Sequence, residues 1–554
     1  MSTLASTRAS APPGWGRFRL PQHEALRDRG ARAMELEQLR ERYVWRLVPG
    51  LPSTLVEMPE SERFGPAKQR RIQSGFTQAA WTLARVGPKV LRSRWRSLDT
   101  FDSLPPKSRQ PASVGRWRSD AEFARQRLMG VNPVVIRRCE QLPSRFGLDA
   151  RALERRVGGG LQIEAALAEG RIFACDYAML EGLSCVAGRF LPAPIGLFHS
   201  SPRGLMPLAI QLGQDPSRDS ISTPTSPTFE WLRARLFLAV ADGHHHQFVT
   251  HLLRCHYEPE PFVIATRRQL HPRHPVHELL APHFRWLFAI NAVARAQAAS
   301  DRGSFGRMKS TGMIGGNELM RRSYGAPFAD RTFVATLEAR GLASADALPG
   351  YLFRDDALAL HAAIARFVAA SLVRIYPDPG SLHADAELQA WAAELVDPER
   401  GRVVGLPGGG RIESLAQLEA ICTELIFRMS AWHTGTSHGQ YDHYANVINA
   451  PNGLHGDRRA AAGEVDEAAL VRMVPKRAAL DQLAAAIAAG TEPMHTLLAP
   501  RETQWAGAPA LMALRVDFGR ELRSLHASVA ARNAGLEQGY ASLDPAHVCE
   551  GVTV

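Results

Sequence analysis

The amino-acid sequence predicts a mainly α-helical fold with small β elements. Helical patterning dominates, and residues 231–256 run without a proline for about 39 Å if fully helical. Ser414 and Gln417 form the pattern of a capping box, which marks the start of another helix. Runs that resemble strands, such as residues 261–266, are short and few. Three further stretches look helical: residues 22–45, 465–490 and 508–535.

The helix that begins at Ser414 has a well-marked apolar face. Continuing this pattern places His433 on the buried side of the helix. The apolar residues at helical spacing are Leu415, Leu418, Ile421, Cys422, Leu425, Ile426 and Met429.

The chain can bury a large core, because it has 554 residues and 45% of them are hydrophobic. Length alone suggests more than one domain, but no linker is long or polar enough to enforce a split. Residues 1–20 are small, polar and proline-bearing, so we expect a flexible N-terminal segment. We expect residues 21–554 to form a single domain, with surface loops at 104–119 and 213–228.

Charge and cysteine content narrow the classes of partner. The net charge of +11 is scattered over amphipathic stretches, and we expect no nucleic acid as a partner. Attraction to fatty-acid carboxylates or anionic lipid is an additional expectation. The six cysteines form no CxxC motif and are expected to be buried free thiols. The N-terminus shows no apolar signal region, so we expect a cytoplasmic protein, although secretion by another route stays open. The sequence contains no run of 18 apolar residues, so we expect no membrane-spanning helix.

Two histidines five residues apart, His251 and His256, are the most informative local feature. Neutral imidazole is a common ligand for iron, zinc and copper. In a plain α-helix, positions i and i+5 point roughly 140° apart. Local widening to an i→i+5 ladder would bring both imidazoles toward one face, and such π-bulges concentrate at functional sites.

The sequence around this pair closely resembles the metal-binding core of lipoxygenases. A second matching segment is HTGTSHGQY at residues 433–441, and the resemblance is looser elsewhere along residues 20–554. The matching pieces near the pair are HHQ before it, then EPFVIATRRQL, HPVHELL, PHFR and INAVAR, with LPAPIGLFHSSPRGLMPLAIQL (191–212) upstream and GVTV at the end. The resemblance implies one large lipoxygenase-like helical catalytic domain, of the bacterial type that lacks the N-terminal β-sandwich.

The resemblance implies a set of metal ligands. His251, His256 and His433 match the three imidazole ligands, and the C-terminal carboxylate of Val554 matches a further ligand, where isoleucine is usual. Ser437 stands at the fourth protein position, four residues after His433. His438, five residues after His433, is the alternative to Ser437.

Other residues of the matching segments carry expected roles near the metal. Gln247 and Gln440 match glutamines that link the metal helix to the substrate pocket, and Asn291 matches a residue that packs helices near it. Ala294 stands at the stereocontrol position, where alanine implies an S-type product. The candidate wall residues of a long apolar pocket are Leu252, Phe262, Ala298 and Phe305.

The resemblance also implies the reaction. Ferric iron carrying hydroxide would take a hydrogen from the bis-allylic CH2 of a polyunsaturated fatty acid of the linoleate and arachidonate class, and O2 would trap the radical to give a hydroperoxide. Manganese is the variant cofactor. We expect a monomer that makes transient membrane contact.

Two other readings stay open at this point. Residues 435–439, GTSHG, match the nucleophile elbow of serine esterases, although that elbow needs a preceding strand. A non-catalytic lipid- or metal-binding relative is the other alternative, because serine is a weak neutral ligand.

Overall fold

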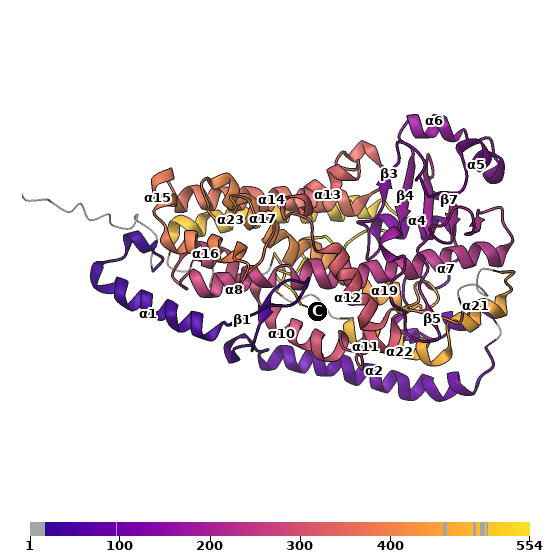
Figure 1. Cartoon of the computed structure of the whole chain (residues 1–554), viewed down its shortest axis with the longest axis horizontal. Coiled ribbons are helices and arrows are strands. Elements are labelled where there is room, and N and C mark those ends of the chain that lie inside the picture. Colours follow the sequence, from indigo (N-terminus) through magenta and orange to yellow (C-terminus); the bar gives the residue numbers. More distant parts are fainter. Residues whose placement is uncertain are drawn as a thin grey trace, which may run out of the picture.

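A computed structural model describes residues 17–95, 97–457, 463–490, 495–498, 505 and 508–553 (Figure 1). Within these residues the chain is mainly helical, as the sequence predicts, and its strands form small antiparallel sheets. Val554 lies outside the described residues, and the side chain of Ala298 is not described either.

The N-terminal part of the chain places two long helices along one edge of the molecule (Figure 1). The second of them packs closely on a C-terminal helix, because a Cβ at Gly75 would lie 3.0 Å from the carbonyl oxygen of Ala488. The elements of this part are α1 (Leu26–Arg42), β1 (Trp45–Arg46), β2 (Thr54–Leu55), α2 (Pro66–Arg92), α3 (Asp99–Asp102) and α4 (Asp120–Met129).

A five-stranded antiparallel sheet, in the order β3-β4-β6-β7-β8, lies at one end of the molecule (Figure 1). Side chains along these strands join two different apolar clusters in alternation, because successive residues of a strand point to opposite faces of the sheet. Ile172 and Ala174 pack with α5 and α6, whereas Phe173 and Cys175 join the main core. The elements here are β3 (Arg137–Arg138), α5 (Ala150–Val157), α6 (Ile163–Ala168), β4 (Ile172–Asp176), β5 (Arg189–Phe190), β6 (Ile195–Ser201), β7 (Gly204–Gln211) and β8 (Ile221–Ser222).

Helices make up most of the remaining chain. Three segments, η5, η7 and η10, are π-helices. The elements are α7 (Thr228–His244), η5 (His245–Tyr257), α8 (Glu260–Gln269), α9 (Pro275–Leu280), α10 (Leu287–Val293), η7 (Ala294–Ala298), α11 (Ser304–Met308), α12 (Gly312–Ser323), α13 (Phe333–Ala339), α14 (Leu352–Ile375), α15 (Pro379–His383), α16 (Ala386–Val396), α17 (Leu415–Phe427), η10 (Arg428–Trp432), α18 (His433–Ser437), α19 (Gln440–Tyr444), β9 (Leu454–His455), α21 (Glu467–Met473), α22 (Lys476–Ala489) and α23 (Pro509–Ala534). Short 3-10 turns complete the chain at η1 (Pro21–His23), η2 (Glu60–Glu62), η3 (Lys107–Arg109), η4 (Ala178–Leu180), η6 (Ala281–Phe284), η8 (Ala329–Arg331) and η9 (Ala345–Ala347).

One described helix, α14, is long and apolar enough to cross a membrane by length and composition. It packs against α17 and α23, and its buried positions include Leu360, Ile364, Phe367 and Leu372. The position of α14 in the protein core accounts for its apolar character.

The helices predicted in residues 22–45, 465–490 and 508–535 are present, and the capping box of Ser414 with Gln417 is confirmed. The stretch 465–490 divides into α21 and α22, because Pro475 cannot continue a helix. The run 261–266 was wrongly read as strand-like: it lies within α8, fully enclosed by other helices, where tertiary packing outweighs β-propensity.

The structure describes the last four residues, 17–20, of the predicted flexible N-terminal segment. Phe18 and Leu20 are fully buried in the main core, because burial of two large apolar side chains outweighs the polar character of the segment. Residues 1–16 of that prediction lie outside the described residues.

Candidate metal centre

A π-helix carries the first two histidines. In η5 the backbone N–H of Glu258 donates to the carbonyl of Leu253, five residues earlier, at 2.9 Å. This wider ladder turns His251 and His256 toward the same side of the helix. The third histidine, His433, opens α18 directly after the π-helix η10.

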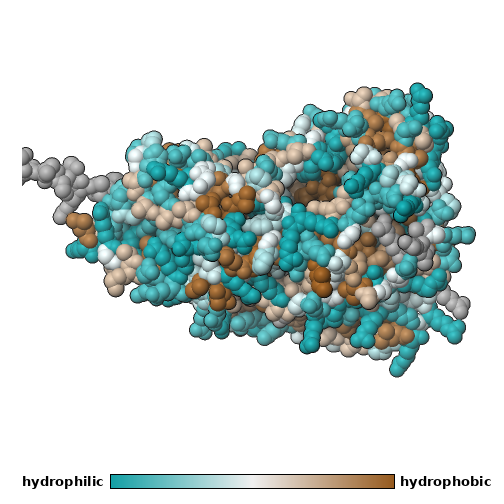
Figure 2. Space-filling model, viewed as in Figure 1, coloured by the Kyte–Doolittle hydropathy of each residue, from teal (hydrophilic) through white to brown (hydrophobic). Residues whose placement is uncertain are grey.

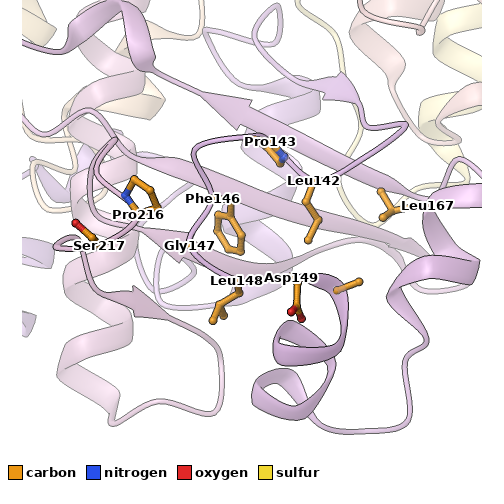
Figure 3. Close-up of a pocket in the computed structure, with 10 residues that line it drawn as sticks. Leu142, Pro143, Phe146, Gly147, Leu148, Asp149, Leu167, Pro216 and Ser217 are labelled. Atoms are coloured by element: carbon orange, nitrogen blue, oxygen red, sulfur yellow. The ribbon is translucent and has the colours of Figure 1, made fainter.

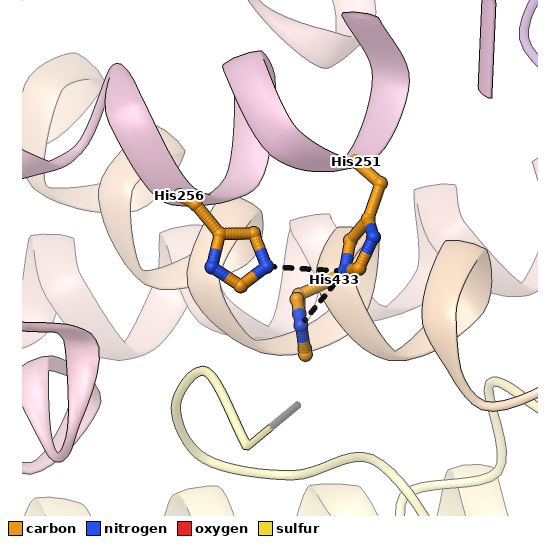
Figure 4. A group of neighbouring side chains, drawn as sticks. All are labelled: His251, His256 and His433. Atoms are coloured by element: carbon orange, nitrogen blue, oxygen red, sulfur yellow. Dashed lines mark hydrogen bonds between the residues drawn. The ribbon is translucent and has the colours of Figure 1, made fainter. Parts of the chain in front are cut away.

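The three imidazoles converge in the buried interior (Figure 4). The Nε2 atoms of His251 and His256 are 3.0 Å apart, and the Nε2 atoms of His251 and His433 are 3.4 Å apart. One ligand atom from each residue lies within 4.8 Å of the others. The structure therefore brings together the three residues that the sequence identifies, although their segments are 177 residues apart at the closest (433 − 256).

These donors fit a divalent or trivalent metal ion. Neighbouring ligands on an octahedral ion with metal–nitrogen bonds near 2.1 Å are separated by about 3.0 Å, which is the spacing observed here. Burial, with the nearby imidazoles, holds the pKa of His251 well below its usual value, and burial lowers the pKa of His256 to about 4. Both imidazoles are therefore neutral at physiological pH, which is the form that binds metals.

Asn291 on α10 orients His256. Its Oδ1 lies 3.0 Å from Nδ1 of His256, and its Nδ2 donates to the carbonyl of the same histidine at 2.9 Å. Asn291 also donates to Glu260 at 2.8 Å, and Arg295 donates to that carboxylate at 2.5 Å. Since Nδ1 of His256 is engaged by Asn291, its Nε2 is directed toward the other two histidines.

A buried ion-pair cluster holds the two histidine-bearing helices together. The carboxylate of Glu258, at the end of η5, contacts Arg428 at 2.5 Å and Arg331 at 2.6 Å, and it also pairs with Arg254. Burial alone would raise the pKa of Glu258, but the three guanidiniums outweigh it and lower that pKa. Arg428 opens η10, so the cluster connects the helix of His251 and His256 to the helix of His433. Sequence reasoning did not find it, because ordinary surface arginines have the same local pattern.

Ser437 is buried, at the end of a hydrogen-bonded chain of two glutamines. Gln247 donates to Oε1 of Gln440 at 2.7 Å, and Gln440 donates to Oγ of Ser437 at 3.2 Å. The two glutamines therefore connect η5 to the segment after His433, and their predicted link to the substrate pocket stays a prediction.

His438 lies differently from the three converging histidines. Its Nε2 is 3.7 Å from Sγ of Cys549 in the C-terminal segment, and burial lowers its pKa to about 4. The group of three histidines whose ligand atoms lie close together does not include His438. The choice between Ser437 and His438 as the fourth ligand stays a prediction.

The C-terminal segment passes beside the histidines (Figure 4, yellow). The backbone N–H of Cys549 donates to Oγ1 of Thr434 at 3.1 Å, next to His433. Val552 is fully buried, and the carbonyl of Thr553 accepts a hydrogen bond from the buried Lys68 of α2. Lys68 was not predicted, because a lone lysine in an amphipathic helix gives no sequence signal.

The predicted pocket residues occupy the surrounding core. Leu252 and Phe262 are buried, and Phe305 packs edge-on against Phe248 of η5, with ring centroids 5.4 Å apart. Ala294 is partly buried at the start of η7, directly after α10. Leu252, Phe262 and Phe305 line neither of the two cavities described in the structure, and the side chain of Ala298 is not described.

A separate surface cavity of about 630 Å³ lies beside the five-stranded sheet (Figure 3). Apolar side chains such as Leu142, Phe146 and Leu148 line it. None of its lining residues is among the predicted site residues, so it is distinct from the histidine site.

The esterase reading is contradicted by the local structure. Ser437 lies in α18, which follows the π-helix η10, whereas a nucleophile elbow requires a strand before the serine. Oγ of Ser437 accepts a hydrogen bond from Gln440.

Comparison with known proteins agrees with this helical fold and buried histidine site. The sequence profile of lipoxygenases matches residues 99–538. Human polyunsaturated fatty acid lipoxygenase ALOX15B is 30% identical over 580 residues, which cover 100% of this chain and 83% of that protein. Human ALOX12 is 30% identical over 572 residues, covering 97% of this chain and 83% of that protein.

Solved structures show the same fold. The crystal structure of coral 8R-lipoxygenase has a TM-score of 0.90 at 27% identity, covering 97% of this chain and 83% of that one. An anaerobic structure of a lipoxygenase variant in complex with arachidonate has a TM-score of 0.89 at 26% identity, covering 97% and 84%. The chain belongs to the lipoxygenase family, and it is a dioxygenase.

Proposed function

We propose that this protein is a non-haem iron dioxygenase that inserts O2 into polyunsaturated fatty acids to give hydroperoxides. The observation that carries the proposal is the convergence of His251, His256 and His433 in a buried site of a lipoxygenase fold. The relatives that share this fold include polyunsaturated fatty acid lipoxygenases and a structure with bound arachidonate.

In this proposal the three histidines hold the metal, with Ser437 at the fourth position and the carboxylate of Val554 completing the set. A bound iron supplies the one-electron oxidation of a bis-allylic C–H bond. Imidazole and oxygen donors also suit manganese, which is the alternative ion.

The protein's own side chains would position the substrate and exclude water. Leu252, Phe262, Ala298 and Phe305 would contribute apolar walls, and the buried surroundings keep the histidines neutral. The methyl group of Ala294 would block one approach of O2 to the pentadiene, and we therefore propose an S-type product.

Several wider features belong to the same proposal. The protein would act as a monomer, and residues 21–554 would form a single catalytic domain of the bacterial type. Its main apolar core runs from Phe18 to Val552, which supports one domain. We also propose a cytoplasmic location, because the buried cysteines Cys139, Cys175, Cys255 and Cys422 are free thiols, as expected in a reducing compartment. Transient contact with a membrane would supply the fatty acid.

One experiment tests the central proposal. Purified protein should contain about one iron per chain, consume O2 and form a conjugated diene with linoleate or arachidonate. His251→Ala, His256→Ala and His433→Ala should each lose metal and turnover, while His383→Ala, an exposed histidine on α15, should retain both. A metal-loaded, folded protein that consumes no O2 with either fatty acid would contradict the dioxygenase assignment. Full iron occupancy in one of the three alanine variants would remove that histidine from the ligand set.

A further inference from the structure

The helix α2 has an outer face with an unusual combination of side chains. It carries six cations, of which Lys68 is buried and the other five are exposed, and residues 63–98 contain no aspartate or glutamate. Large apolar side chains are exposed on the same helix: Trp81 at 61%, Leu91 at 57% and Phe76 at 49%. The exposed surface of α2 is therefore strongly basic and also carries large apolar side chains.

The inner face of α2 is already occupied by the protein. Ala79, Thr82 and Val90 are buried, and Gly75 touches α22. The outer side chains therefore have no packing role within the described fold. Trp81, Arg85 and Arg92 fall at spacings of four and seven residues, which places them on one side of the helix.

The apolar and basic groups are physically paired. The guanidinium of Arg85 lies 4.4 Å from the ring centroid of Trp81, so a cation sits over an exposed aromatic face. The lower edge of the molecule, which α2 follows in Figure 1, combines brown apolar and teal hydrophilic side chains in Figure 2. Helices with Lys/Arg and Trp/Phe/Leu in this arrangement lie in the interface of a lipid bilayer.

We infer that the outer face of α2 docks on an anionic lipid bilayer, with Trp81 and Leu91 at the acyl boundary and the cations at the headgroups. This inference rests on the proposed function, because an enzyme that oxygenates fatty acids draws its substrate from membranes. A second copy of the chain is a poor occupant, since two such faces would oppose five exposed cations each. Anionic headgroups complement the charge.

The docking helix is connected to the histidine site. Its first turn carries Lys68, which donates to the carbonyl of Thr553 and lies 5.1 Å from the ring centroid of Trp286. The same C-terminal segment contacts Thr434 beside His433. A membrane bound at α2 would therefore lie against the element that leads to the buried site.

Vesicle binding by the full chain tests this inference. Wild-type protein should float with phosphatidylcholine vesicles that contain about one quarter phosphatidylserine, but not with pure phosphatidylcholine, and raised salt should weaken the binding. The double variant Arg85→Gln, Arg92→Gln should bind roughly fivefold more weakly per arginine removed. Trp81→Ala should bind about tenfold more weakly, because a large apolar anchor is lost.

Matched controls separate α2 from general surface effects. Arg520→Gln with Arg523→Gln removes two exposed arginines from α23, and Ile314→Ala removes a 66% exposed apolar residue from α12. Both should bind vesicles like the wild type. Trp81→Phe should keep most of the binding but lose the part of the tryptophan fluorescence that brominated lipids quench.

The outcomes are decisive for the docking face. Absence of binding to anionic vesicles, or equal binding by α2 variants and controls, would overturn the inference, as would an α2-dependent dimer or α2-dependent binding of nucleic acid in place of lipid. Oxygenation of dispersed linoleate on the same preparations keeps the two proposals apart. If α2-dependent vesicle binding persists without turnover, the docking face stands and the proposed function fails. If turnover persists without vesicle binding, only the docking face fails.

Discussion

Asn291 ties His256 to α10 by bonds at both its Nδ1 and its backbone carbonyl, so the direction of the His256 ring depends on one amide side chain. The same amide donates to Glu260, whose charge is balanced by Arg295. The orientation of a proposed ligand is therefore set by residues on three helical segments, α8, α10 and η7.

Replacement of the Asn291 amide should weaken metal binding without removing a metal ligand. We expect Asn291→Ala to lower the metal affinity by about 10–100-fold, because His256 loses the group that fixes its ring. Competition with a chelator measures this effect. Asn452→Ala, which removes another buried amide that bonds to Lys309, is the control and should keep the metal. Unchanged affinity in Asn291→Ala would show that ring orientation is fixed by other contacts.

The choice between Ser437 and His438 can be made with two substitutions. Ser437→Asn should retain iron or bind it more tightly, since an amide oxygen is a better donor than a neutral hydroxyl. His438→Ala should leave iron in place, because its imidazole lies against Cys549. Metal content by elemental analysis is the measurement. Loss of iron in His438→Ala alone would identify that histidine as the ligand.

At the scale of elements, the helix that presents His433 is delimited by a capping box. Oγ of Ser414 accepts from the N–H of Gln417, and the Gln417 side chain accepts from the N–H of Ser414. Along α17 the apolar residues face the core as their spacing indicates, and the ladder then widens at η10 before His433.

Removal of this cap should cost stability and spare the site. We expect Ser414→Ala to reduce the free energy of unfolding by about 1 kcal/mol, because two backbone N–H groups lose their partners. Thermal unfolding measures the change, with metal content as the second readout. Ser528→Ala on the exposed side of α23 should leave the unfolding temperature unchanged. If Ser414→Ala unfolds like the wild type, the capping box does not contribute to stability.

At the scale of the whole molecule, neutral histidines in the core make stability depend on pH. Burial lowers the pKa of His244 and of His246 from 6.5 to about 3. In the unfolded chain these groups take up protons below pH 6.5, whereas in the folded chain they stay neutral until about pH 3. The unfolded state thus binds more protons in this window, and the free energy of unfolding falls as the pH falls through it.

Acid should therefore destabilise the protein well before its carboxylates titrate. Each fully titrating histidine should contribute about 1.4 kcal/mol per pH unit below its unfolded pKa. Unfolding temperatures measured with and without metal, from neutral pH down to about pH 4, test this expectation. A flat profile over that range would mean that the buried histidines become protonated without unfolding.

The C-terminus gives a second test at this scale. If Val554 donates its carboxylate, one appended glycine would move the charge and force extra atoms into packed surroundings, where Val552 is fully buried. Deletion of Val554 would retract the carboxylate by roughly 3.5 Å. Both changes should lower iron content and stop diene formation, whereas an N-terminal tag should be harmless. Normal iron and turnover in a C-terminally tagged protein would refute this ligand assignment.

Local spacing in the sequence predicted the helices and the geometry of the first histidine pair, and the resemblance to lipoxygenases added His433 as the third imidazole. The five-residue spacing of His251 and His256 indicated a π-helix, and η5 has that geometry. Helical periodicity is a property of neighbouring residues, so it can be read from the chain alone. The continuation of the α17 pattern placed His433 on the buried side for the same reason.

Tertiary structure decided the rest. Residues 195–201 and 204–211 form the strands β6 and β7, and residues 261–266 form part of α8, although each of the three stretches is short and contains several apolar residues. Such runs are ambiguous until their neighbours are known. The bond from Lys68 to Thr553 joins residues 485 positions apart, and the Glu258–Arg428 pair joins residues 170 apart. Contacts of this kind depend on how whole helices pack. The sequence by itself determined which histidines are the candidate metal ligands, and the packed fold determined which residues orient them.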